Sequence, residues 1–278
     1  MASSEPIVCK PTAWFLCRAA IIFLMFAVFT VLFYIDGSTG YREDNVVYYV
    51  YQTFEPASKQ FANMKQEGGL TPESWREYAS AQKVSFPEDH SILPEGFQLP
   101  MAWPEILYDY NRVESLQWKQ WWLDYSEKEG YPANPPEKAH DARSIREQWI
   151  FFYICGGLSA ITLFFLIRTN FREITATEDA IISQDGRKVP YADMNRLDLR
   201  KWDNKGIAII EYVGSSTSGK LRIDGLTYGG FKKENDQPAE KLMDRIRSKF
   251  SGELLEYTSI LDEPDADAES DEESKPEP

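Results

Sequence analysis

The stretch that organises the chain is Trp149–Ile167, WIFFYICGGLSAITLFFLI, an apolar run without a formal charge. At about 1.5 Å of rise per residue, a helix of this length reaches roughly 28 Å, which is close to the thickness of a bilayer core. The run also separates a helix-rich stretch from a strand-rich stretch. We therefore interpret residues 149–167 as a transmembrane helix; the alternative is a buried helix of a soluble domain.

A second apolar run, Ala19–Ile35, follows a short polar segment, residues 1–18. A secretory signal peptide is the competing interpretation of a run in this position. The run is longer than a usual signal-peptide core, and no small-x-small cleavage site follows Tyr34. The sequence thus favours an uncleaved anchor and a two-pass membrane protein.

The basic residues that flank the two runs predict the orientation in the membrane. On the terminal sides they are Lys10, Arg18, Arg168, Arg172, Arg187 and Lys188; between the runs they are Arg42, Arg143 and Arg146. Basic residues are enriched in cytoplasmic flanks. We expect a protein of the cell (inner) membrane with both termini in the cytoplasm.

The pattern of residues 36–148 predicts a helical extracytoplasmic domain. An apolar stripe at helical spacing comprises Val47, Val50, Phe54, Ala57, Phe61 and Met64. Pro56 predicts a kink in this stripe or a new helix that begins near Thr53. Thr71-Pro72 predicts the capped start of a short helix.

The rest of this domain combines prolines with aromatic residues. Prolines exclude a continuous helix between Phe86 and Trp103, and Pro104 should begin a further helix. That helix carries Trp118, Trp121 and Trp122. We expect these indoles to pack on the apolar stripe as a core, and an aromatic ligand site is the alternative. Asp141 is a candidate N-cap for a last helix that continues into the second span.

Composition excludes several kinds of function. A net charge of −14 argues against a nucleic-acid partner. His90 and His140 lie far apart without nearby cysteines, so the sequence predicts no catalytic, metal-binding or cofactor-binding residues and no cofactor. The three cysteines, Cys9, Cys17 and Cys155, lie in the N-terminal segment and in or beside apolar runs, which does not support a disulfide framework.

After Arg168 the apolar period changes from 3.6 to 2, which predicts an antiparallel sheet with one wet face. Its inward positions are Leu197, Leu199, Ala208, Ile210, Tyr212, Leu221 and Ile223. Asp185-Gly186 is a hairpin-turn signal, and Pro238 should begin an amphipathic helix. The tail, residues 259–278, is acidic with almost no apolar residues and is expected to be disordered.

The stretch IISQDGRKVPYADMNRLDL, followed by KGIAIIEY, KLRIDGLTYGGF and the helix, resembles bacterial pleckstrin-homology-like (PH-like) domains. The whole arrangement is similar to uncharacterised two-pass bacterial membrane proteins that carry such a domain at the C-terminus. The resemblance implies an α+β membrane protein whose residues 168–258 form a cytosolic PH-like module, and it implies docking rather than chemistry.

Two small sets of residues are candidates for contacts with partners. Gly156 and Ala160 form a small-residue pair on one face of the second span, which suits packing against the first span or a second copy, and so a possible homo-oligomer. Arg200, Lys220 and Arg222 form a possible docking face, although nearby acids make ordinary surface ion pairs the competing interpretation.

From these features we predict a non-enzymatic membrane adaptor or scaffold that contacts the lipid bilayer and a protein partner. The alternative is an accessory subunit of a membrane transporter or of an envelope enzyme complex. Neither apolar run contains an acidic or basic residue, so the chain alone offers no polar pathway for transport.

Overall fold

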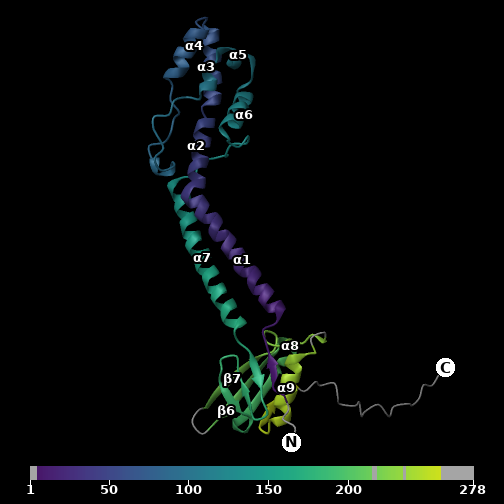
Figure 1. Ribbon diagram of the computed structural model, residues 1–278. Helices are drawn as coiled ribbons and strands as arrows, with labels where there is room; N and C mark the ends of the chain where they lie inside the picture. The colour runs from purple at the N-terminus through teal and green to yellow at the C-terminus, as the bar shows by residue number, and fades with distance from the viewer. Residues whose placement is uncertain (1–4, 215–217, 234–235, 258–278) are drawn as a thin grey trace, which may run out of the picture. The chain divides into compact units, whose positions relative to one another are not determined.

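The computed structural model describes residues 5–214, 218–233 and 236–257, which form an α+β protein (Figure 1). The chain divides into two compact units. Unit 1 comprises residues 1–21 and 164–278, and unit 2 comprises residues 22–163. The acidic tail predicted for residues 259–278 lies outside the described residues.

Two described helical segments are long and apolar enough to cross a membrane. The first begins with α1 (Ala13–Ile35) and continues through the π-helix η1 (Asp36–Gly40), and the second is α7 (Ala142–Asn170). The predicted N-cap of the last helix is confirmed, because the Ser144 amide donates to Asp141 Oδ1 at 2.7 Å.

Unit 2 is built around an aromatic core that α2 (Tyr41–Tyr51) and α3 (Phe54–Gln66) share with shorter helices. The predicted break near Thr53 is confirmed by the gap between these two helices. The shorter helices are α4 (Pro72–Ala81), η2 (His90–Ile92), η3 (Glu105–Tyr108), α5 (Tyr110–Ser115) and α6 (Trp118–Glu129). Trp121 and Trp122 are buried, and the Trp122 ring packs edge-on against Phe54 at 5.5 Å, so these indoles form core as predicted.

The single helix expected after Pro104 is wrong, because the structure divides it into η3, α5 and α6. The Asp109 carboxylate accepts a hydrogen bond from the Arg112 amide at 3.3 Å and so caps a new helix in the middle of the stretch. Leu116 and Gln117 are then extended, which ends that helix and lets the next begin at Trp118.

Unit 1 contains two four-stranded sheets and the C-terminal helix α9 (Pro238–Lys249). The first sheet has the order β1 (Ile7–Cys9), β2 (Ile174–Ala176), β3 (Ala180–Ile182), β4 (Lys188–Pro190). The second has the order β7 (Ser218–Asp224), β6 (Ile207–Val213), β5 (Met194–Lys201), β8 (Glu253–Leu255). The short helices η4 (Tyr191–Asp193) and α8 (Trp202–Lys205) adjoin β5. All the predicted inward positions from Leu197 to Ile223 are buried, and the helix predicted from Pro238 is confirmed.

Strand β1 is the feature that the sequence analysis did not predict. Ile7 pairs with Ala176, and Cys9 pairs with Ile174, so a segment that precedes the first apolar helix belongs to the sheet that follows the second. Cys9 is fully buried, its Sγ donates to the Pro238 carbonyl at 3.3 Å, and burial raises the pKa of its thiol to about 12. Residues 5–12 therefore belong to the folded unit 1.

Helix α9 fixes this strand in place. Arg245 Nη1 donates to the Glu5 carbonyl at 2.6 Å and to the Ala176 carbonyl at 3.2 Å, so one guanidinium joins the chain on both sides of the β1–β2 pair. Side chains from the β3–β4 turn of the first sheet donate hydrogen bonds to β7, an edge strand of the second sheet. Gln184 Nε2 donates to the Arg222 carbonyl at 3.0 Å, which satisfies an acceptor that backbone pairing leaves free.

We expect a soluble fragment that joins residues 5–12 to residues 172–257 through a flexible linker to unfold cooperatively. Cys9→Asp should lower its free energy of unfolding by at least about 3 kcal/mol, because a buried carboxylate there would have no partner. Urea denaturation followed by the fluorescence of Trp202 would measure the loss. Val8→Asp, on the more exposed face of the same strand, should cost less than about 0.5 kcal/mol. Equal losses for the two variants would contradict the insertion of β1.

Candidate functional site

The π-helix η1 begins where the first apolar helix ends, and its sequence, Asp-Gly-Ser-Thr-Gly, explains its position. Two glycines within five residues weaken an α-helix. The Tyr41 amide donates to the Asp36 carbonyl, which is the wide turn that defines this element. Such turns leave some carbonyls free to accept from side chains, and they are frequent at functional sites.

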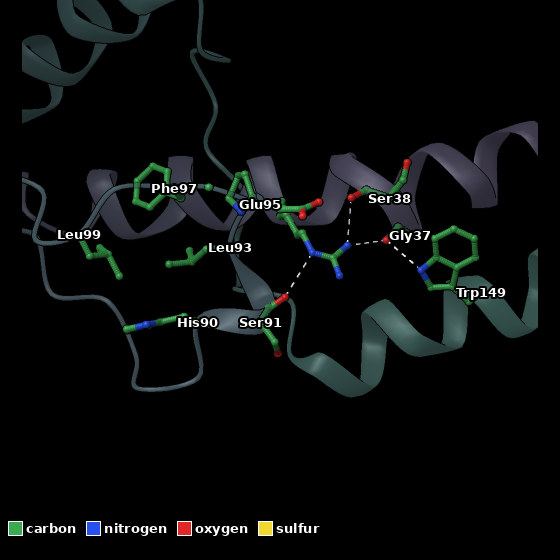
Figure 2. Close-up of a pocket in the computed structure, with 12 residues that line it drawn as sticks. Gly37, Ser38, His90, Ser91, Leu93, Glu95, Phe97, Leu99 and Trp149 are labelled. Atoms are coloured by element: carbon green, nitrogen blue, oxygen red, sulfur yellow. Dashed lines mark hydrogen bonds between the residues drawn. The ribbon is translucent and has the colours of Figure 1, made fainter.

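Arg42 uses those free carbonyls. Its Nη1 donates to the Gly37 carbonyl at 2.5 Å and to the Ser38 carbonyl at 3.1 Å, while its Nε donates to the Ser91 carbonyl at 3.2 Å. Figure 2 shows these bonds converging between the helix and the loop around Ser91. No carboxylate pairs with Arg42 in the part of the chain that the structure describes. The guanidinium thus joins the π-helix to the proline-containing loop through backbone acceptors alone.

Trp149 closes the same site from α7. Its Nε1 donates to the Gly37 carbonyl at 3.1 Å, as Figure 2 shows. A Cβ at Gly37 would lie 3.1 Å from that nitrogen and 3.3 Å from Gln148 Cβ. A side chain at position 37 would therefore push these neighbours away by a few tenths of an ångström, and glycine avoids that displacement. The Tyr34 ring packs edge-on against the Trp149 ring at 5.8 Å and extends the contact.

These elements enclose a pocket of about 810 Å³, within the range of small-molecule sites. It is lined by Gly37, Ser38, Arg42, His90, Ser91, Leu93, Pro94, Glu95, Gly96, Phe97, Leu99 and Trp149. The lining combines backbone polar groups with apolar side chains, and its titratable groups are Arg42, His90 and Glu95. No described residues form a group of histidine, cysteine or acidic side chains suited to a metal ion. The arrangement places hydrogen-bonding groups beside an apolar wall, which suits the binding of a ligand.

Asn45 holds the loop that carries the pocket residues Ser91 and Leu93. This fully buried side chain donates to the Ile92 carbonyl at 2.9 Å and to the His140 carbonyl at 2.8 Å, and it accepts from the His140 amide at 2.6 Å. The His140 ring stacks on Tyr41 at 3.7 Å, and burial raises the pKa of the Tyr41 hydroxyl. One amide side chain thus joins α2, the loop and the segment that leads into α7.

Sequence reasoning considered His90 and His140 only for a metal site or a catalytic triad, and it did not predict this pocket. The available signal was a glycine-rich DGSTG stretch at the end of an apolar run, followed by Arg42. That signal predicts a weak point in a helix, but it does not identify the residues of the distant loop that complete the site.

The predicted docking residues lie on the outward side of the second sheet, and each has an acidic neighbour. Arg200 pairs with Asp198 at 2.8 Å, Lys220 with Glu211 at 2.6 Å and Arg222 with Asp224 at 3.4 Å. The Arg200 guanidinium lowers the pKa of the Asp198 carboxyl to about 2. Exposed pairs of this kind contribute about 0–1 kcal/mol each, and together they leave the face with little net positive charge.

Gly156 and Ala160, the predicted packing pair, have different surroundings. Gly156 faces the first helix, because a Cβ added there would lie 3.6 Å from Thr30 Cγ2. Ala160, one turn later, is exposed. Aromatic rings also contact each other between the helices, with the Phe33 and Phe151 rings stacked at 5.4 Å between centroids.

We expect Asn45→Ala to lower the free energy of unfolding of the helical domain by about 3 kcal/mol, because it leaves two buried carbonyls and one amide without their partner. Thermal unfolding of the detergent-solubilised chain, followed by near-ultraviolet circular dichroism, would measure the change. Asn63→Ala, at an exposed position of α3, is the matched control and should be neutral or slightly stabilising. A neutral Asn45→Ala would contradict the supporting role.

Comparisons of the chain with protein-family models, with curated proteins and with solved structures found no match.

Proposed function

We propose that this chain is a non-enzymatic adaptor of the cell (inner) membrane, with two transmembrane helices and both termini in the cytoplasm. The observation that carries the proposal is the pairing of β1 with β2. A chain that leaves one folded unit through α1 and returns to it through α7 must cross the bilayer an even number of times. The basic residues around Lys10, Arg18 and Arg168 support a cytoplasmic position for that unit.

The loop that follows β7 supports a mechanical link between the sheets and the membrane. It is bonded to the chain just before α1, since the Thr12 amide donates to the Thr227 carbonyl and the Gly229 amide donates to the Lys10 carbonyl, both at 2.8 Å. Tyr228 of this loop also lies beside Thr169 near the end of α7, which offsets part of the rise that burial causes in the Tyr228 pKa. A partner that displaces either helix end would therefore strain the same loop.

In this proposal unit 1 is a PH-like docking module, and the helical domain of unit 2 meets an extracytoplasmic partner. Two small sheets closed by the amphipathic helix α9 suit a module of that kind. The pocket beside Arg42 is the surface that we assign to the outer partner, because it joins exposed backbone polar groups to an apolar wall.

The topology predicts a labelling pattern for cysteines placed in a background without the three native ones. Gly69→Cys should react with a membrane-impermeant maleimide on intact cells. Glu5→Cys and Asn204→Cys should react only after the membrane is permeabilised, because both belong to unit 1. The reverse pattern would move the helical domain inside, and different results for Glu5→Cys and Asn204→Cys would contradict the pairing of β1.

The adaptor function predicts a protein partner at the pocket. A photo-crosslinking amino acid at Glu95, in the pocket wall, should capture a defined partner in intact membranes, whereas one at Glu73 on α4 should not. Mass spectrometry of the crosslinked bands would identify the partner. If no partner is captured and the purified chain alone conducts ions or converts a substrate, the adaptor proposal must be dropped.

A further inference from the structure

Three arginines in unit 1 surround a single carboxylate, that of Asp185. Arg172 Nη1 lies 2.5 Å from Asp185 Oδ1, Arg168 Nη2 lies 3.7 Å from the same oxygen, and Arg187 Nη2 lies 3.8 Å from Oδ2. Arg168 lies in the last turn of α7 and Arg172 in the segment that leads from α7 to β2, whereas Asp185 and Arg187 belong to the β3–β4 turn. Two segments thus bring three positive charges and one negative charge together.

The carboxylate leaves much of this charge unsatisfied. Only Arg172 lies within hydrogen-bonding distance of Asp185, and the cluster keeps a formal excess of two positive charges. The side chains of Arg168 and Arg187 are 42% and 49% exposed, so their remaining N–H groups can reach a ligand. A guanidinium presents paired donors whose geometry matches two oxygens of a phosphate.

The position of the cluster indicates where such a phosphate would come from. Arg168 directly follows Ile167, the last residue of the second apolar run. Phe171 lies between Arg168 and Arg172 in sequence and is 83% exposed, the highest value among the large apolar side chains that the structure describes. An exposed apolar ring beside arginines suits the edge of a bilayer, where the ring can meet the acyl chains while the arginines keep their charged groups among the headgroups.

From this geometry we propose that Arg168, Arg172 and Arg187 bind the phosphate of an anionic phospholipid in the leaflet where α7 ends. The inference rests on the membrane topology proposed above. Asp185 holds the three guanidinium groups near one another in the absence of lipid, and it competes with the phosphate for them. A lipid phosphate is preferred to a free anion because the cluster adjoins the apolar run itself.

The test uses the full chain, purified in mild detergent and examined by native mass spectrometry with added phosphatidylglycerol or phosphatidylcholine. The wild-type chain should retain phosphatidylglycerol preferentially. The double variant R168Q/R187Q should lose that preference by roughly tenfold or more, because each arginine near an anionic headgroup changes binding several-fold. Arg200→Gln, which removes a paired arginine from the second sheet, is the control and should bind as the wild type does.

Asp185→Asn separates lipid binding from a purely structural role. If the arginines bind lipid, removing the competing carboxylate should keep or strengthen the preference for phosphatidylglycerol. If the ion pair only stabilises the fold, Asp185→Asn should lose this preference as R168Q/R187Q does. Such a loss, or a wild-type chain without preference, would overturn the inference. So would displacement of the lipid by excess inorganic phosphate, which would indicate a site for soluble anions.

Membrane insertion is measured separately for each variant by resistance to carbonate extraction. A wild-type chain that is extracted by carbonate contradicts the proposed topology. A chain that resists extraction but shows no preference for phosphatidylglycerol contradicts only the lipid site.

Discussion

The pairing of β1 with β2 is the constraint on which unit 1 depends. Residues Ile7–Cys9 supply an edge strand and the buried Cys9 side chain, and Glu5, just before them, supplies a backbone acceptor for Arg245. Cys9 Sγ also lies in a tight position, because a Cβ at Gly229 would approach it to 2.9 Å. The sheet, α9 and the loop after β7 therefore share one contact region, and none of them can move far without disturbing the others.

Unit 2 is held together by an aromatic core and by polar side chains that hydrogen-bond one element to another. Aromatic rings fill the space between α3 and α6, but they specify distance better than orientation. Asn45 and Arg42 add directional bonds to the loop around Ile92 and Ser91. A buried polar group without a hydrogen-bond partner costs more free energy than a formed hydrogen bond contributes. These contacts therefore favour one arrangement of the loop over the alternatives.

Much of the local structure could be predicted from the sequence, because periodicity and capping act over a few residues. The buried side of β5–β7, the break near Thr53 and the N-cap at Asp141 all follow from such patterns. Strand β1 could not be predicted, since three residues are too few to show alternation and the partner strand lies far along the chain. The pocket was missed for a similar reason: its wall joins the π-helix to a loop that only tertiary contacts bring near Arg42.

The pairing of β1 also has a consequence for biosynthesis. Cys9 and Pro238, which share a hydrogen bond, are 229 positions apart, so the first strand to leave the ribosome must wait for almost the whole chain before it can be buried. Until then its apolar side chains stay accessible to chaperones and proteases. A chain truncated before α9 lacks the helix whose first residue, Pro238, accepts the Cys9 hydrogen bond.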